Sequence, residues 1–517
     1  MVADRQPLHA FLDELLAEQG RLHTPVVQAS HAHDHYVSGA QRSALNAQLI
    51  PLSAPGPNEQ YAFEVDLDSC SGCKACVVAC HALNGLDETE AWRDVGLVHG
   101  GASAAPFQQT VTTACHHCAD PGCLNGCPVL AYEKDPSTGI VRHLDDQCIG
   151  CQYCILKCPY DVPKYNERLG IVRKCDMCHQ RLAVGEAPAC AQACPTQAIK
   201  IVKVELHLSA TPRVDTSSFL AAAPSPAYTQ PTTRYRSKQP LPANLTAADE
   251  AVLRPQHPHW PLVVMLTLIP ASVGIYATAA LATFVPGPFV TYYVTNFAWL
   301  LGAIGLAASV FHLGQPLRAW RIFLGWRKSW LSREAMVFGA WFGLATPATL
   351  LATPWWPAAI PLPITQAQLL FATTLVGVAG LFCSVMIYVD TQRVFWKFES
   401  TAPRFFGTAL IVGLATLFPR AAAIALLAKL AFESTSLRGA SPSARLLRGP
   451  LLRFTQLRFA LGFVGIAGLV AQILNGNRDL FVTFYITNGL LLAGEIAERY
   501  LFFRAVDSPK MPGTVRA

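Results

Sequence analysis

The sequence predicts two folds in one chain of 517 residues, a small α+β domain built around cysteines and then an all-α bundle that spans a membrane several times. Sixteen of the 17 cysteines lie in four groups of four within residues 70–194. From Pro261 onward, long apolar segments alternate with short loops rich in arginine. With 52% hydrophobic and 14% charged residues, the chain is also too long for one core and too apolar for a purely soluble protein.

Residues 1–60 are expected to form an extension ahead of the cysteine-rich domain. Apolar side chains at helical spacing from Leu8 to Leu16 predict one short amphipathic helix. The alternating histidines from His31 to His35 fit an exposed loop better than a metal site, although histidine-rich tracts can bind metals. The first residues contain neither an apolar signal core nor a twin-arginine pair, so we expect no export.

The third cysteine group carries the strongest signal in the sequence. It is Cys148, Cys151, Cys154 and Cys158 followed by Pro159, which is the C-x2-C-x2-C-x3-C-P spacing of bacterial 4Fe-4S proteins. Three thiolates at this spacing can wrap one cubane, whereas the fourth lies about one helical turn further on and can reach a neighbouring cluster. This group therefore predicts an iron–sulfur domain.

The other three groups vary the same spacing. The first has His81 in place of the proline, and the second and fourth end in Cys-Pro. Their members are Cys70, Cys73, Cys76, Cys80; Cys115, Cys118, Cys123, Cys127; and Cys175, Cys178, Cys190, Cys194. Sixteen thiolates suffice for four 4Fe-4S clusters. We therefore expect a ferredoxin-like double-dicluster domain over residues 61–205, flanked by strands near 61–65 and 199–204.

Zinc and disulfide bonds are the alternative explanations of these cysteines. Paired C-x2-C motifs also build zinc sites, but zinc would leave Cys76 and Cys154 without a role and the three Cys-Pro endings unexplained. In the absence of a secretory signal, a reducing compartment is expected to keep the thiols free. The seventeenth cysteine, Cys383, lies in an apolar run and is expected to be a small buried hydrophobic side chain.

The second half of the chain has the composition of a membrane domain. Residues 206–257 are rich in Pro, Ala, Ser and Thr without periodicity, which predicts a linker or a strap over the first domain. A membrane anchor of seven or eight transmembrane helices is expected over 258–505, before a C-terminal tail at 506–517. The apolar segments are 261–284, 292–311, 335–353, 367–389, 405–432, 457–475 and 480–503.

The charges in the loops predict the orientation of this anchor. The loops after the second and fourth segments are basic, whereas 285–291 and 354–366 contain no lysine or arginine. By the positive-inside rule, the basic loops and the cysteine domain lie on the cytoplasmic side of the bacterial inner membrane. The basic residues from Arg420 to Arg453 conflict with a single crossing at 405–432. A hairpin broken at Pro419 would remove the conflict, although this segment is short for two full spans.

In its order of features, the chain resembles two subunits of the dimethyl sulfoxide reductase family of molybdoenzymes, fused into one. Residues 60–205 are similar to the iron–sulfur subunit in their cysteine spacings. Residues 258–505 are similar to the membrane anchor subunit in the stretches that begin at His312, at Ser332 and at Leu492.

The resemblance implies which cysteines share a cluster. In four-cluster subunits of this kind, the first and fourth groups share two clusters, and the second and third groups share the other two. The implied sets are Cys70, Cys73, Cys76, Cys194; Cys80, Cys175, Cys178, Cys190; Cys115, Cys118, Cys123, Cys158; and Cys127, Cys148, Cys151, Cys154. No cysteine is missing, so four cubanes are expected.

The same resemblance implies a quinol site at His312 and Glu334. These residue types suit the chemistry, because quinol oxidation releases two protons with two electrons and ionisable groups at the membrane edge need a reason to be there. The plainer alternative is that His312 caps one helix and Glu334 begins another. Glu495 and Arg499 are spaced to pair with each other. His312 is the only histidine after His259, so no haem held by two histidines is expected in the membrane half.

These observations predict an electron-transfer and membrane-anchor subunit with no pterin-binding domain of its own. It would oxidise quinol from the membrane quinone pool and pass electrons through four clusters to a separate molybdopterin-containing catalytic subunit, as in anaerobic respiration. Two alternatives stay open: the reverse flow from a dehydrogenase to quinone, and a membrane-tethered ferredoxin relay without a quinone site. The net charge of +6 follows the membrane topology, and no nucleic-acid partner is indicated.

Overall fold

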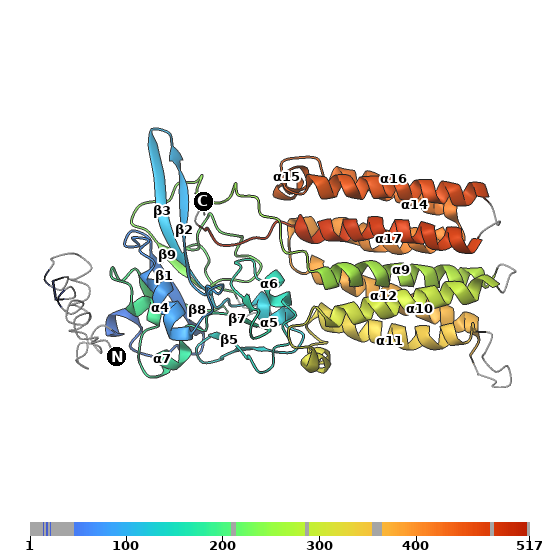
Figure 1. The fold of residues 1–517 in the computed structure, drawn as a ribbon. Helices are drawn as coiled ribbons and strands as arrows, with labels where there is room; N and C mark the ends of the chain where they lie inside the picture. Colours follow the sequence, from blue (N-terminus) through green and yellow to red (C-terminus); the bar gives the residue numbers. More distant parts are fainter. Residues whose placement is uncertain are drawn as a thin grey trace, which may run out of the picture.

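The structure is a computed structural model that describes residues 46–207, 213–284, 289–353, 364–475 and 480–513, together with Glu14, Ala17, Glu18 and Arg21. The apolar side chains between Leu8 and Leu16 and the histidines from His31 to His35 lie outside these residues. Figure 1 shows the cysteine domain at one end of a bundle of long helices that run side by side. The predicted fold class, an α+β domain followed by a helical bundle, is confirmed.

The cysteine domain contains two three-stranded sheets. In the first, β1 (Glu59–Asp66) pairs antiparallel with β8 (Ile199–Glu205), which confirms the two predicted strands, and β9 (Arg234–Arg236) joins β1 in parallel. In the second, β2 (Asp94–Ala102) and β3 (Ala105–Thr113) form a hairpin next to β10 (Thr246–Ala247). Both sheets are small, and cysteines lie among the apolar side chains of the buried core.

Short elements fill the space between the sheets. Two further hairpins pair β4 with β5 and β6 with β7. Their bounds are β4 (Tyr132–Lys134), β5 (Val141–His143), β6 (Lys164–Asn166) and β7 (Ile171–Arg173). The helices of this domain are α4 (Ala75–Asn84), α5 (Gly122–Gly126), α6 (Tyr153–Lys157), α7 (His179–Ala183) and α8 (Ala189–Gln192).

The segment rich in Pro, Ala, Ser and Thr packs along the cysteine domain where it is described. It supplies β9 to one sheet and β10 to the other. The Thr229 hydroxyl donates to the Tyr160 hydroxyl over 3.1 Å, and the Thr232 hydroxyl donates to the His116 carbonyl over 2.7 Å. These contacts attach residues 213–253 to the loops that carry the cysteines, so this part of the segment acts as a strap.

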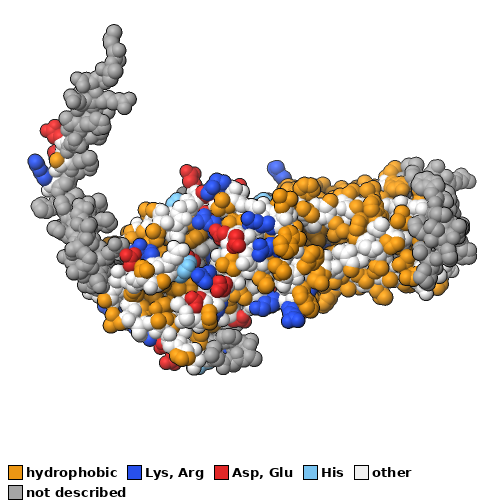
Figure 2. Space-filling model, turned by 90° about the horizontal axis from the view of Figure 1, so that it is seen from below, with side chains coloured by type: hydrophobic (Ala, Val, Ile, Leu, Met, Phe, Trp, Pro, Cys, Tyr) orange, Lys and Arg blue, Asp and Glu red, His pale blue; other side chains and the backbone are white. Residues whose placement is uncertain are grey.

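The second half is a bundle of eight long helices within the described residues. They are α9 (Trp260–Ala282), α10 (Phe289–Val310), α11 (Trp330–Leu350), α12 (Gln366–Val389), α13 (Phe398–Ala415), α14 (Pro419–Thr435), α16 (Leu452–Asn475) and α17 (Leu480–Arg504). Four of them, α9, α10, α12 and α16, are long and apolar enough to cross a membrane by length and composition. Figure 2 shows the hydrophobic surface of the bundle and the basic side chains gathered near its junction with the cysteine domain.

Close backbone packing holds α9 in the centre of the bundle. A Cβ atom at Gly274 of α9 would lie 1.8 Å from the carbonyl oxygen of Ala409 in α13, and one at Gly413 would lie 2.4 Å from the Gly274 carbonyl. Neither position therefore tolerates a side chain. Helices inside a membrane associate largely through such close approaches of small residues, because lipid removes the hydrophobic drive between them.

The apolar segment 405–432 is a helical hairpin. Helix α13 ends at Ala415, and Pro419 is the first residue of α14. With this extra crossing, the loop that carries Arg438, the short helix α15 (Pro442–Arg448) and the start of α16 lie at the cysteine-domain end of the bundle (Figure 1). Of the basic residues that conflicted with a single crossing, only Arg420 begins a helix at the opposite end. The apolar segment 405–432 is shorter than α13 and α14 together, because the outer ends of both helices contain charged residues.

Those charged residues form a buried network among four helices. Arg458 of α16 binds both carboxylate oxygens of Glu433 over 2.8 Å and one of Glu495 over 3.0 Å. Lys429 of α14 donates to Glu495. Arg404 of α13 lies 3.1 Å from Glu498. All of these side chains are nearly inaccessible to solvent.

Glu495 and Arg499, whose spacing allows them to pair, do not pair with each other in the described structure. Glu495 binds Lys429 and Arg458 instead, whereas Arg499 lies 3.5 Å from Glu498 and stacks over Phe405 at 3.9 Å from the ring centroid. Helical spacing alone favoured the neighbour on the same helix, but the cations of α14 and α16 are within reach once the bundle is assembled.

We expect Arg458→Met to lower the thermal stability of the bundle substantially. Removal of one member of a buried ion pair leaves its partners uncompensated, which costs about 3–5 kcal/mol. Thermal unfolding of the detergent-solubilised protein measures the change. Arg453→Met, at an exposed position of the same helix, is the matched control and should leave the midpoint unchanged. Equal midpoints for both variants would show that the network contributes little.

Candidate functional site

The four cysteine groups share one backbone turn. In every group, the residue before the second cysteine has a positive φ: Gly72 (72°), His117 (41°), Gly150 (70°) and Met177 (59°). The left-handed conformation curls the loop so that successive cysteine side chains point to one centre. Glycine adopts this conformation at no steric cost, but His117 and Met177 adopt it despite their side chains. The sequence therefore signals this turn in only two of the four groups.

A second shared feature lies at the last cysteine of the groups that end in Cys-Pro. The backbone N–H four residues later donates to the sulfur, from Ala131 to Cys127 over 3.2 Å and from Ala198 to Cys194 over 3.3 Å. In the first group His81 replaces the proline, and α4 continues past Cys80. There, the Asn84 side-chain amide, also four residues on, donates to the Cys80 sulfur over 3.6 Å. N–H donors at sulfur favour the thiolate form that metal clusters require.

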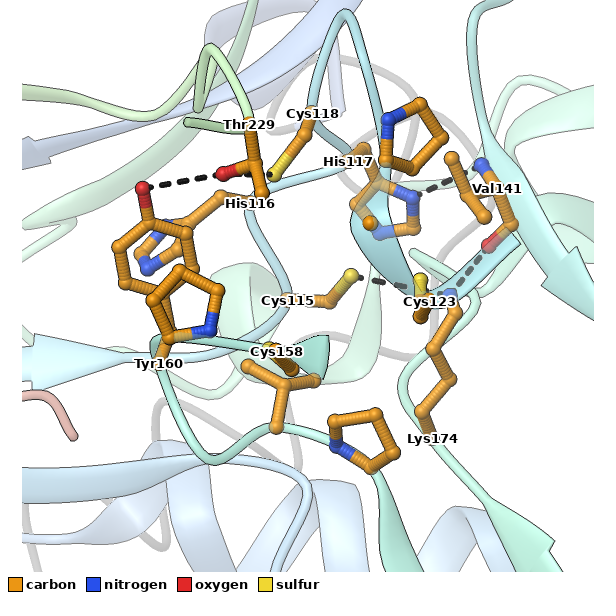
Figure 3. Close-up of a pocket in the computed structure, with 15 residues that line it drawn as sticks. Cys115, His116, His117, Cys118, Cys123, Val141, Cys158, Tyr160, Lys174 and Thr229 are labelled. Carbon is orange, nitrogen blue, oxygen red and sulfur yellow. Dashed lines mark hydrogen bonds between the residues drawn. The ribbon is translucent and has the colours of Figure 1, made fainter. Parts of the chain in front are cut away.

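The structure brings cysteines from different groups together. Two sets line cavities, one with Cys115, Cys118, Cys123 and Cys158, the other with Cys70, Cys73, Cys76 and Cys194. Figure 3 shows the first of these, with the four labelled sulfur-bearing side chains around one space. Each set takes three cysteines from one group and the fourth from another.

Electrostatic interactions link the thiols of the remaining cysteines across groups. Burial raises the pKa of the Cys80 thiol to about 12, and the charges of Cys190 and Cys178 add to this rise. Burial likewise raises the pKa of Cys154 well above its ordinary value, with further contributions from Cys151, Cys148 and Cys127. Without metal these thiols would be protonated at neutral pH. Iron would fit them well, because a bound metal displaces the protons.

Short helices connect neighbouring sets. Helix α4 carries Cys76 and Cys80, and α8 carries Cys190 shortly before Cys194, so both connect the same two sets. Helices α5 and α6 join the other two sets in the same way. Lys174 bridges the two pairs, because its ammonium donates to the Cys175 carbonyl over 2.8 Å and lies 3.6 Å from the Cys115 sulfur. The four sets therefore follow one another through the domain.

One end of this series rests on the helical bundle. The loop after α10 packs on the third cysteine group, where the Gln315 N–H donates to the Ile149 carbonyl over 3.0 Å and Arg318 donates to the Cys148 carbonyl over 3.3 Å. Gly314 lies so close to Gly170 that a Cβ atom would be 2.2 Å from its carbonyl oxygen. At the opposite end of the series, Cys73 is exposed to solvent.

His312 lies at this junction. Its Nε2 is 3.2 Å from the Cys151 carbonyl oxygen. A carbonyl only accepts, so Nε2 carries the proton and Nδ1 is left as an acceptor. Burial lowers the pKa of His312 to about 4, although the hydrogen bond to Cys151 opposes this. The imidazole is therefore neutral at neutral pH.

Sequence reasoning missed two neighbours of His312. The His259 ring lies 5.2 Å from the His312 ring, and the His257 ring lies 4.9 Å from that of His259. Both precede α9, and His312 follows α10. A hairpin of two successive membrane helices brings its outer ends to the same side, so the predicted topology already contained this signal.

Glu334 lies near the start of α11 and is 4% exposed. The Ser384 hydroxyl of α12 donates to its carboxylate. Among the described residues, no ion pair involves Glu334, and no hydrogen bond joins it to His312. The two predicted quinol residues therefore lie at the same end of the bundle on successive helices without direct contact.

Comparison with known protein families also separates the cysteine domain from the helical bundle. Residues 107–204 match a 4Fe-4S dicluster domain, and residues 255–438 match the DMSO reductase anchor subunit. The B subunit of the anaerobic dimethyl sulfoxide reductase of Haemophilus influenzae is 34% identical over 182 residues, which cover 34% of this chain and 87% of that protein. The B subunit of the Escherichia coli K12 enzyme is 37% identical over 148 residues, which cover 27% and 72% respectively.

A second kind of relative is named as a subunit of a different enzyme. The formate dehydrogenase-O iron-sulfur subunit of Escherichia coli K12 is 36% identical over 176 residues. The match covers 31% of this chain and 58% of that subunit's length. The iron–sulfur half is thus shared between two kinds of complex, whereas the anchor match points to one.

We expect removal of iron to unfold the cysteine domain and leave the bundle helical. Buried thiols lie within the core of this domain, and a site that forms only in the folded state adds its metal-binding energy to folding. Oxidative chelation followed by limited proteolysis measures this: residues 61–205 should become susceptible to cleavage while the helical bundle stays intact. Protection of both halves after complete loss of iron would contradict the expectation.

Proposed function

We propose that this protein, which belongs to the dimethyl sulfoxide reductase family as an iron–sulfur subunit fused to an anchor subunit, oxidises membrane quinol and relays the electrons to a separate catalytic subunit. The observation that carries this proposal is the series of four cysteine sets between the bundle end at His312 and the exposed Cys73. A relay needs one end at the electron source and the other within reach of a partner.

We assign one 4Fe-4S cluster to each set. The membrane-end set is Cys127, Cys148, Cys151 and Cys154; the second is Cys115, Cys118, Cys123 and Cys158; the third is Cys80, Cys175, Cys178 and Cys190; the outer set is Cys70, Cys73, Cys76 and Cys194. The shared left-handed turn supports the same ligand chemistry at all four. Each cluster, when bound, accepts and donates one electron at a time. The protein itself supplies the spacing, the exclusion of water and the N–H donors.

We place quinol oxidation at the junction, near His312 and Glu334. The acceptor Nδ1 of His312 suits the hydroxyl of a quinol, because the other ring nitrogen is fixed by the Cys151 carbonyl. That same backbone belongs to the membrane-end set, so the proposed donor and first acceptor are neighbours. Glu334 is a buried carboxylate with a serine as its hydrogen-bond partner, which suits a group that receives a proton.

We further propose that the cysteine domain faces the cytoplasm. The basic loops after α10, α12 and α14 lie at the cysteine-domain end, and the described helices leave only Arg420 beginning a helix at the other end. This distribution follows the positive-inside rule. The 3-10 helix η2 (Pro316–Phe323) supports the same boundary, because its exposed Leu317, Trp320 and Phe323 recur every three residues on one face next to arginines, as at a lipid interface.

A molybdopterin-containing protein is the proposed partner, with dimethyl sulfoxide reductase-like activity. The match to iron–sulfur subunits of two molybdoenzyme complexes supports such a partner, and the anchor match supports quinol oxidation. The formate dehydrogenase relatives favour one second candidate, in which a dehydrogenase partner delivers electrons and this chain reduces quinone. In both cases the protein is the electron-transfer and anchor subunit of the complex.

Gentle solubilisation of native membranes and capture of this protein tests the partnership. We expect a large subunit to co-purify in stoichiometric amount and to contain molybdenum, because the outer set is exposed toward a partner. Identification of that subunit would also separate the reductase from the dehydrogenase. An iron-loaded protein isolated without any molybdenum partner, under conditions that keep related complexes intact, would favour the membrane-tethered ferredoxin relay.

Substitution of the junction residues tests the quinol site. We expect Glu334→Gln and His312→Asn to slow the reduction of the clusters by added quinol by roughly 100-fold or more, because each removes a group that handles the quinol protons. Reduction by dithionite should be unaffected. Glu399→Gln, an exposed carboxylate at the same end of the bundle, is the matched control. Unchanged quinol rates in both junction variants would place the site elsewhere.

A further inference from the structure

Arg93 is a buried cation in the cysteine domain that the proposed function does not yet use. It directly precedes β2 and is 2% exposed. Only one side-chain hydrogen bond holds it in the described structure, from Nη1 to the Thr112 hydroxyl over 3.1 Å. Its guanidinium carbon also lies 4.7 Å from the centroid of the Phe63 ring. Within the described residues, its Nε and Nη2 have no hydrogen-bond partner.

No carboxylate in the described structure neutralises this charge. The nearby Glu90 is bound by Arg173 over 3.1 Å and by Asn166. A fully buried cation without a counter-ion is strongly unfavourable, so the site must contain negative charge that the side-chain carboxylates do not provide.

The surroundings of Arg93 identify that negative charge as sulfur. Cys190, Cys76, Cys175 and Cys80 lie close enough to interact electrostatically with its guanidinium. Cys76 belongs to the outer set, and the other three belong to the third set. Thr112, which binds Arg93, also has its hydroxyl 3.5 Å from the Cys76 sulfur. The guanidinium therefore lies between the two sets farthest from the membrane.

Lys174 provides a useful contrast. It is also buried, but its ammonium donates to the carbonyls of Val141 and Cys175 and approaches the Cys115 sulfur. Its donors are therefore occupied by named partners. Arg93 instead keeps two N–H groups free of described partners in a space bordered by cysteines, and the rigid planar guanidinium can serve two neighbouring sites at once.

We propose that Arg93 is the shared counter-ion of the third and outer cluster sites and raises the reduction potentials of both. This inference rests on the proposed assignment of four clusters. Reduction adds one negative charge to a cluster, and a nearby fixed positive charge stabilises that state more than the oxidised one. Electrons would then be drawn from the membrane end toward the exposed end. In this role Arg93 supplies a fixed positive charge and is not a ligand of either cluster.

Redox titration of the full-length protein in detergent, followed by electron paramagnetic resonance, tests the proposal. The variants are Arg93→Met, which removes the charge, and Arg93→Lys, which keeps it. Arg236→Met is the control, since Arg236 is a mostly exposed side chain paired with Glu64 in the same domain. Iron content per protein molecule is measured first. We expect Arg93→Met to lower two of the four midpoint potentials and leave the other two unchanged, Arg93→Lys to stay near the wild type, and the control to change none.

Four unchanged potentials in a fully iron-loaded Arg93→Met protein would overturn the inference and leave the four-cluster assignment intact. A wild-type protein with iron for fewer than four clusters would instead refute the assignment. If Arg93→Met fails to load iron, Arg93→Gln, which keeps N–H donors without the charge, replaces it. Equal downward shifts in Arg93→Lys and in the uncharged variant would show that packing and not charge sets the potentials.

Discussion

The need to keep charge out of water at fixed positions governs both halves of this protein. In the first half, sixteen sulfur ligands must be held at cluster spacing inside a domain whose core also contains apolar side chains. The fold solves this with one left-handed turn repeated four times, and with N–H donors four residues after the last cysteine of a group. In the first group, which lacks the proline, the Asn84 side chain provides the N–H donor to the Cys80 sulfur instead.

The same constraint shapes the bundle and the junction. Helices α13, α14, α16 and α17 bury charged side chains that are acceptable only because Arg458 and Lys429 compensate Glu433 and Glu495. This network fixes the helical hairpin, and the hairpin returns the basic loops to the cysteine-domain end. At that end, glycines allow the loop after α10 to touch the third cysteine group, so the proposed quinol region and the first cluster site share one set of hydrogen bonds.

Sequence reasoning worked where the pattern was local. Cysteine spacing identified the iron–sulfur domain, and apolar runs located all the long helices of the bundle except the hairpin at 405–432. It failed where assembly decides the outcome. The ends of α13 and α14 looked too polar for a membrane, because Arg404 and Glu433 pair most closely with Glu498 and Arg458 on other helices. Arg93 is one of 40 basic residues in the sequence, and only its burial between two cysteine sets distinguishes it.

The central claim is that electrons enter this protein from quinol and reach clusters held by its own cysteines. It is tested most directly with the purified, iron-loaded protein in lipid nanodiscs without any partner subunit. Addition of a short-chain quinol should bleach the visible absorption of the clusters, because the membrane-end set lies against the proposed quinol site. Full bleaching by dithionite but none by quinol, at complete iron loading, would contradict the account.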